Sequence, residues 1–110
     1  SILPGPQCSL SALVRNTAQL PQVELEARPR RLLGANTADC LHSGIVYGTA
    51  AMLDGMSRRS AQRWAHPTRR VVATGTLPDS VRTACATDIV YRETLVLEGL
   101  YWIWKKNTRK

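Results

Sequence analysis

The sequence predicts an α/β fold made mostly of helices with a few short strands. Residues 37–64 carry small and apolar side chains at helical spacing, which indicates one long helix. Residues 71–73 and 89–91 are short apolar runs typical of buried strands. A helical segment at about residues 79–86 lies between these strands, and strands that alternate with helices are typical of α/β proteins.

The first 31 residues predict one helix and an irregular connection. Residues 3–6 (Leu-Pro-Gly-Pro) are typical of a tight turn. A helix is expected from an N-cap at Ser9 to about Gln19. Its apolar side would carry Leu10, Leu13, Val14 and Thr17. Residues 23–26 alternate apolar and acidic side chains in a short extended piece, and residues 28–31 predict a solvated arginine-rich linker.

The long helix is expected from about Thr37 to Trp64, with Thr37 as N-cap and Asp39 at the positive end of the helix dipole. Small residues recur three and four apart along one stripe, at Gly44, Gly48, Ala51 and Gly55. Glycine costs roughly 1 kcal/mol in a helix interior relative to alanine. The stripe therefore indicates close approach of another backbone, either in a tight bundle within the chain or at an interface.

The rest of this helix is expected to pack into a core. Its neighbouring apolar face carries Leu41, Ile45 and Met52. Cys40 is expected to be buried as a small hydrophobe, which is the usual state of a free cysteine.

The first strand, residues 71–73, runs into the turn Thr74-Gly75-Thr76, and a helix is expected to start at Asp79 or Ser80. A strand that ends in a small-residue turn and feeds a helix resembles a phosphate or nucleotide cradle, because free backbone N–H groups and the helix dipole favour anions. An ordinary turn after a strand is the alternative interpretation.

After the second strand, a final helix is expected from a cap at Thr94 to about Lys106. Its apolar side would carry Leu95, Leu100, Trp102 and Ile103, with Gly99 as a close-packing position. Trp102 and Trp104 are two residues apart and point in different directions, so at least one is expected at the surface or at an interface.

Charge and cysteine content narrow the class of protein. The formal net charge is +7 and the pI about 10.0, but the basic residues are scattered and aromatic residues are only 5% of the chain. Without a basic stripe that carries interleaved stacking residues, a dedicated nucleic-acid module is not expected. The three cysteines are far apart, with no metal-ligand spacing, so reduced thiols in a cytoplasmic protein are expected. Neither a signal peptide nor a membrane span is expected.

No catalytic constellation is evident from the residues themselves. The chain has neither a nucleophile elbow nor a Walker A sequence, and its aspartates are dispersed.

The order of several short segments nevertheless resembles the C-terminal half of type III pantothenate kinases, which belong to the actin-like superfamily of sugar kinases and heat-shock ATPases. The matching segments are residues 3–5, 9–13, 17–24, 34–37, 43–45, 47–48, 73–75, 94–95 and 97–100. The agreement in order and spacing extends over nearly the whole of residues 1–110. The fold that the resemblance implies is the C-terminal part of an actin-like (ribonuclease H-like) ATPase domain.

The resemblance implies ATP-dependent phosphorylation of pantothenate to 4'-phosphopantothenate, the first step towards coenzyme A. It also implies Mg²⁺ and a monovalent cation as cofactors. In the family the N-terminal half supplies the phosphate-binding loop, the catalytic aspartate and a pantothenate motif. None of these is in this sequence, so the chain alone is expected to be inactive and to need a complementary N-terminal half.

The resemblance carries roles to individual positions. Thr37 matches a threonine that reaches pantothenate bound in the partner subunit. Pro4 and Gly5 match a loop near the nucleotide, and Thr74, Gly75 and Thr76 match the adenosine-binding turn. The helix that carries Gly44, Gly48 and Gly55 matches the dimer-forming region.

Two positions differ from the family pattern. The family has a second glycine where this chain has Thr76, and a β-branched residue resists positive φ and fills space that a nucleotide needs. His42 stands where glutamine is common. A degenerate, non-catalytic dimerisation or regulatory module of the same family is therefore the alternative function.

Overall fold

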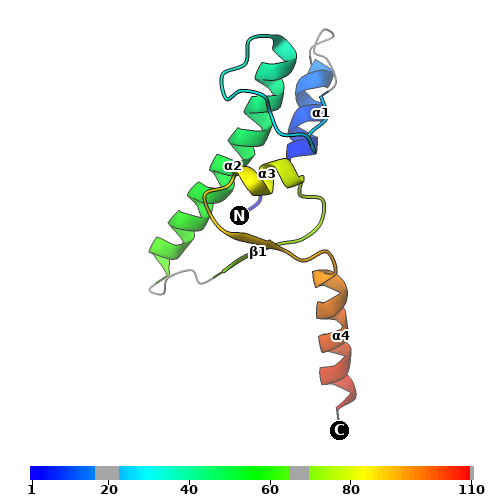
Figure 1. The fold of residues 1–110 in the computed structure, drawn as a ribbon. Helices are drawn as coiled ribbons and strands as arrows, with labels where there is room; N and C mark the ends of the chain where they lie inside the picture. Colours follow the sequence, from blue (N-terminus) through cyan, green and yellow to red (C-terminus); the bar gives the residue numbers. More distant parts are fainter. Residues whose placement is uncertain (17–22, 65–69, 110) are drawn as a thin grey trace.

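The computed structural model describes residues 1–16, 23–64 and 70–109. The elements are α1 (Pro6–Asn16), α2 (Thr37–Arg63), β1 (Val71–Ala73), α3 (Asp79–Ala84), β2 (Ile89–Tyr91) and α4 (Leu95–Thr108). In Figure 1, α2 runs diagonally from the top of the molecule to its lower left, α1 and α3 lie beside it, and α4 projects away at the lower right. The predicted class, mostly helical α/β, is confirmed.

The two strands form a small parallel sheet. Val71 pairs with Ile89, Val72 with Val90 and Ala73 with Tyr91, and the backbone N–H of Arg92 continues the ladder to the carbonyl of Ala73 at 2.9 Å. Parallel strands need a crossover connection, which here contains α3. Parallel sheets are normally covered on both faces, yet the side chain of Val72 lies exposed.

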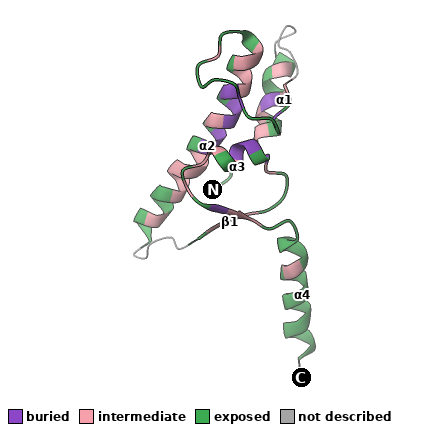
Figure 2. Cartoon of the chain, viewed as in Figure 1, coloured by how far each residue is buried: buried purple, intermediate pink, exposed green. Residues whose placement is uncertain are grey.

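The core lies where α1, α3 and the segment of residues 23–26 meet the N-terminal half of α2. It consists of Leu10, Leu25, Ile45, Val46, Ala50 and Val81. Figure 2 shows this burial concentrated in the upper half of the molecule. Burying each large aliphatic side chain contributes roughly 1.5–3 kcal/mol, so the upper half holds most of the hydrophobic stabilisation.

The N-terminal ends of the first two helices differ from prediction, α1 in its first residue and α2 in its N-cap. α1 begins at Pro6 rather than after Ser9, because proline has the helical φ fixed and lacks the N–H that a first turn would leave unpaired. The N-cap of α2 is Asn36, not Thr37. Its backbone is extended and its side-chain oxygen accepts from the N–H of Asp39 at 2.8 Å, while its amide nitrogen donates to the Asp39 carboxylate at 3.2 Å.

The expectation for Cys40 is wrong, because this side chain is exposed. Its thiol donates to the carbonyl of Gly34 at 3.4 Å, on the side where residues 32–36 fold against the first turn of α2. A Cβ at Gly34 would lie 2.4 Å from the backbone nitrogen of Cys40, so only glycine fits there. Of the predicted core face, Ile45 is buried and Leu41 packs against the cluster.

Two other predicted packing faces are only partly observed. Leu13, on the expected apolar side of α1, is exposed. Thr17 lies outside the described residues, as does the predicted end of that helix. The small-residue stripe of α2 is not packed within the described part of the chain: a Cβ at Gly44, Gly48 or Gly55 would have nothing within 4 Å. A tight bundle inside these segments therefore does not explain the stripe, and the interface stays a prediction.

Candidate functional site

The turn after β1 borders a hollow of about 590 Å³. Its walls come from three segments that are far apart in the sequence. The residues that line the hollow are Gln7 of α1, then Val23, Glu24, Leu25 and Glu26, and finally Thr76 and Pro78. Of the three residues predicted to bind the nucleotide at this turn, Thr76 lines the hollow, and Thr74 and Gly75 are exposed beside it.

The backbone of this turn places its positive φ on glycine. Gly75 has φ +83°, which glycine adopts without the steric penalty of a Cβ. The hydroxyl of Tyr91 donates to the carbonyl of Gly75 and holds the turn against β2. Thr76 has no positive φ, so the backbone strain expected at this position is absent. The difference between Thr76 and the glycine of the family pattern can therefore act only through the volume of the threonine side chain.

The segment before α1 is brought to the same region. Pro4 and Gly5 are exposed, and the carbonyl of Gly5 accepts from the N–H of Ser9 at 2.9 Å, which continues the helix. Gln7, two residues after Gly5, lines the hollow opposite Thr76. Pro4 and Gly5 themselves do not line the hollow, so of the residues predicted to contact the nucleotide only Thr76 lines it.

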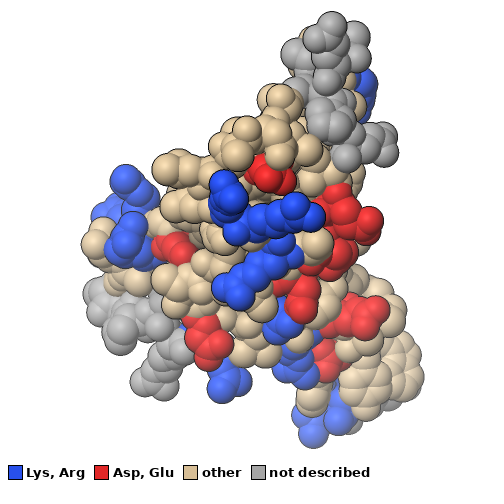
Figure 3. Space-filling model, turned by 45° about the horizontal axis from the view of Figure 1, so that its top comes forward, with Lys and Arg blue, Asp and Glu red and all other residues tan. Residues whose placement is uncertain are grey.

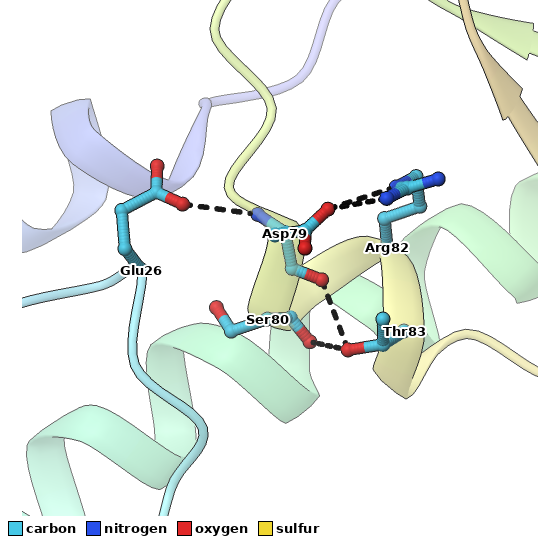
Figure 4. Close-up of polar contacts among 5 residues, drawn as sticks. All are labelled: Glu26, Asp79, Ser80, Arg82 and Thr83. Atoms are coloured by element: carbon cyan, nitrogen blue, oxygen red, sulfur yellow. Dashed lines mark hydrogen bonds and ion pairs between the residues drawn. The ribbon is translucent and has the colours of Figure 1, made fainter.

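Glu26 is tied to the start of α3 (Figure 4), and so is its neighbour Leu25. The carboxylate of Glu26 accepts from the N–H of Asp79 at 3.3 Å, and the hydroxyl of Ser80 donates to the carbonyl of Leu25. The side chain of Asp79 pairs with Arg82, and the hydroxyl of Thr83 donates to the carbonyl of Asp79 at 2.9 Å. These contacts fix one wall of the hollow against a helix that begins 53 residues later.

The electrostatics of this hollow favour a neutral polar ligand over a phosphate. Glu24 and Glu26 line it, and no lysine or arginine is among its described lining residues. The N-terminus of α3 is neutralised by Glu26 and by its own Asp79. Carboxylates accept hydrogen bonds from sugar hydroxyls, as in dinucleotide-binding folds. Among its described lining residues the hollow thus offers carboxylate acceptors for ligand hydroxyls and no cation for a phosphate. The alternation of apolar and acidic residues in 23–26 predicted that both glutamates lie on the same side of this segment. No pattern in the sequence predicted that they lie near the turn of residues 74–76.

A second, open groove of about 490 Å³ lies on α2 and shares no residue with the first. It is lined by Leu32, Leu33, Gly34, Cys40, Ser43, Gly44, Tyr47 and Gly48. Two residues of the predicted small-residue stripe thus form its floor. Thr37 is exposed at the start of α2, at the top of Figure 1, and lines neither hollow.

His42 and Ser43 anchor the segment that precedes this groove. The ring Nε2 of His42 hydrogen-bonds the carbonyl of Ala27 at 2.7 Å, and the hydroxyl of Ser43 donates to the carbonyl of Leu32. Leu33 is left 84% exposed beside the groove. A large aliphatic side chain this exposed, next to glycines that admit a close neighbour, is typical of a contact surface.

Asp54 joins α2 to the segment after α3. Its two carboxylate oxygens accept from the N–H of Ala86 at 2.8 Å and of Thr87 at 2.9 Å. Partial burial raises the pKa of Asp54, but these hydrogen bonds and the charge of Arg58 outweigh it and hold the pKa below 3.8. Burial and the neighbouring Asp54 charge raise the pKa of the Cys85 thiol, which keeps it unreactive. Asp54 is a structural residue that the sequence did not single out.

Among the described residues, no three His, Cys, Asp or Glu side chains gather closely enough to hold a metal ion by themselves. On the face shown in Figure 3, basic groups gather near the centre and at the left, and acidic groups lie beside them, mostly to the right. None of the helices in the described ranges combines the length and the apolar character that a membrane span requires.

Comparisons with known proteins agree with the resemblance in the sequence. A family model described as type III pantothenate kinase matches residues 1–59. The type III pantothenate kinase of Acidothermus cellulolyticus is 42% identical over 107 residues, 96% of this chain and 41% of that protein. That of Thermobifida fusca is 41% identical over 110 residues, 98% of this chain and 42% of that protein. The Desulforapulum autotrophicum protein of this description is 39% identical over 100 residues, 91% of this chain and 38% of that protein. The chain thus spans about two fifths of the length of these relatives.

Proposed function

The chain belongs to the type III pantothenate kinase family, and from this premise we propose that it forms the C-terminal part of an enzyme that phosphorylates pantothenate with ATP. The observation that carries the proposal is the family match, with about two fifths identity to relatives across nearly the whole chain. The product is 4'-phosphopantothenate.

Within that enzyme, the hollow beside residues 74–76 takes the nucleoside of ATP. Its volume of about 590 Å³ suits an adenosine, and Glu24 and Glu26 accept from the ribose hydroxyls. The triphosphate points away from these carboxylates, towards the part of the enzyme outside this chain. Phosphoryl transfer requires positioning and charge neutralisation, so this chain positions and the other part supplies the charged groups and the catalytic aspartate. Mg²⁺ and a monovalent cation would be held there as well, in a cytoplasmic enzyme.

The exposed α2 face serves self-association. A second copy can approach Gly44, Gly48 and Gly55 closely, because no side chain of the described residues occupies that space. Thr37, exposed at the start of the same helix, then reaches pantothenate held in the partner subunit. A hydroxyl at a helix N-terminus suits a polar or anionic ligand.

The proposed fold of the complete domain is actin-like. The two strands described here have three residues each and one open face, which makes them too small to stand alone as a sheet. Strands from the N-terminal part would extend this sheet.

The test joins this chain to the N-terminal part of the Acidothermus cellulolyticus relative, in one polypeptide or by co-expression, and measures ATP-dependent phosphorylation of pantothenate. The chain alone should show none, and the combination should show it. A combination that folds but binds neither ATP nor pantothenate would refute the proposal. The nucleoside site is tested with Glu24→Ala, which should raise the KM for ATP more than it lowers kcat.

The second candidate is a non-catalytic dimerisation or regulatory module of the same family. Thr76 favours it, because its side chain fills part of the hollow where the family has glycine. A Thr76→Gly variant separates the two: if the joined protein binds no nucleotide with either residue but still self-associates, the non-catalytic module is the better description.

A further inference from the structure

Within the described residues, α4 has no core to pack against. None of its residues is buried, and Figure 2 shows it almost wholly exposed. Its exposed large apolar residues are Leu95, Val96, Leu97, Leu100, Tyr101, Trp102, Ile103 and Trp104. Gly99 was predicted as a close-packing position, but a Cβ there would have nothing within 4 Å among the described residues. A helix this apolar around most of its circumference is normally buried.

The connection between α4 and the rest of the described chain is confined to its first turn. A side-chain ion pair joins Arg92 to Glu98 at 2.8 Å, and backbone hydrogen bonds link Leu95 to Arg92 and Glu98 to Thr94. The ion pair is about half exposed and therefore contributes little. These contacts orient the start of α4 but bury none of its apolar surface.

The side chains of α4 divide into two faces. At roughly 100° per residue, one arc of about 160° is apolar as far as Trp104, and Asn107 and Thr108 extend it with polar side chains in the last turn. It carries Val96, Leu97, Leu100, Tyr101, Ile103 and Trp104. The opposite side carries Glu98, Lys105 and Lys106 with Trp102, and the Lys105 ammonium lies 5.1 Å from the centre of the Trp102 ring. Trp104 is near the middle of the apolar arc, and Trp102 points almost directly away from it.

We propose that the apolar arc of α4 docks on the N-terminal part of a type III pantothenate kinase and joins that part to this chain. This inference rests on the family assignment and on completion by an N-terminal part, as in the proposed function, but not on catalysis. The relatives extend over more than twice the matched length, which supplies an occupant of sufficient size. α4 also follows β2 directly, and the sheet exposes the side chain of Val72, so a body that covers or extends the sheet would lie near the start of α4.

The shape of the arc distinguishes this occupant from others. Two helices of a second copy would pair along a narrow apolar seam of two positions per heptad, whereas this arc is about twice as wide. A helix that lies on a membrane carries lysines along its whole polar face. Here the lysines Lys105 and Lys106 are confined to the last turns.

Two matched variants test the proposal, Trp104→Lys and Trp102→Lys. Both tryptophans are about three fifths exposed in this chain, so neither substitution disturbs the described core. The chain is mixed with the N-terminal part of the Acidothermus cellulolyticus relative, and the dissociation constant is measured. The wild type and Trp102→Lys should bind alike, and Trp104→Lys should bind at least about tenfold more weakly. If the separate N-terminal part does not fold, the same variants are compared by thermal unfolding in a single-chain fusion, where only Trp104→Lys should lower the midpoint.

Equal behaviour of the two variants, or a folded N-terminal part that does not bind the chain, would overturn the proposal. Loss of self-association of the chain alone in Trp104→Lys would assign the arc to a second copy instead, and loss of binding to anionic phospholipid vesicles would assign it to a membrane surface. Phosphorylation of pantothenate is measured in parallel. If the N-terminal part binds the chain but pantothenate is not phosphorylated, only the proposed function is refuted. If pantothenate is phosphorylated at the same rate in the wild type and in both variants, only the docking is refuted.

Discussion

Gly34→Ala should destabilise the chain, although it adds one methyl group to a loop. The added Cβ would lie 2.4 Å from the Cys40 nitrogen and 2.7 Å from the carbonyl carbon of Asp39, where ordinary contacts begin at 3.4 Å. The shortfall is about 1 Å and falls on helix backbone, which cannot rotate away as a side chain does. Residues 32–36 must then move away from the first turn of α2.

The magnitude follows from two effects. Overpacking against a rigid neighbour costs about 1–3 kcal/mol. Displacing the loop also removes the Asn36 cap, a hydrogen bond of 2.8 Å to the Asp39 N–H, which costs about 1 kcal/mol. The free energy of unfolding should therefore fall by about 2–4 kcal/mol, and the midpoint of thermal unfolding by about 10 °C or more.

Gly48→Ala is the matched control. Its Cβ meets nothing within 4 Å, and alanine is better than glycine in a helix interior by about 1 kcal/mol, so this variant should unfold about 4–8 °C higher. Both are measured by far-ultraviolet circular dichroism during heating and urea titration. A Gly34→Ala chain as stable as the wild type would refute the contact between residues 32–36 and α2. A Gly48→Ala chain less stable than the wild type at concentrations where both are monomeric would refute the open space beside Gly48.

Three further outcomes are expected. Asp54→Asn should lower the free energy of unfolding by about 1–2 kcal/mol, because two N–H groups lose a charged acceptor. The folded-state pKa of Asp54 is depressed, so this contribution is present above the unfolded pKa and is lost as the pH falls through the folded value. Urea titrations of wild type and variant should therefore converge in acid and differ at neutral pH. Gly48→Leu should abolish self-association in analytical ultracentrifugation without changing nucleotide affinity, and an unchanged oligomeric state would exclude α2 as the interface. Thr37→Ala in the joined protein should raise the KM for pantothenate and leave that for ATP unchanged, whereas equal KM values would remove Thr37 from the substrate site.

The sequence predicted the elements well where local signals are strong. Both strands were predicted at their observed residues, and the long helix was predicted to within about one residue at each end. The helix starts were less certain, because Pro6 and Asn36 compete with nearby Ser9 and Thr37 and the choice depends on the exact backbone. The family assignment also came from the sequence, since it depends on the order of short motifs and not on their packing.

Contacts between distant segments were decided only by the tertiary structure. The hollow joins Gln7, residues 23–26 and Thr76, and no spacing rule connects positions that far apart. The charge at that hollow likewise depends on which side chains converge there, and the sequence alone did not bring Glu24 and Glu26 to the turn.

Burial was the property that the sequence determined least. The glycine stripe of α2 and the apolar residues of α4 carry the pattern of packed faces, yet both are exposed in the described structure. A local pattern indicates that a helix face is covered, because small and hydrophobic residues recur at helical spacing whether the covering surface is in the same segment or elsewhere. It does not record whether the covering surface belongs to the same segment, since that depends on how the chain and its partners are arranged in space.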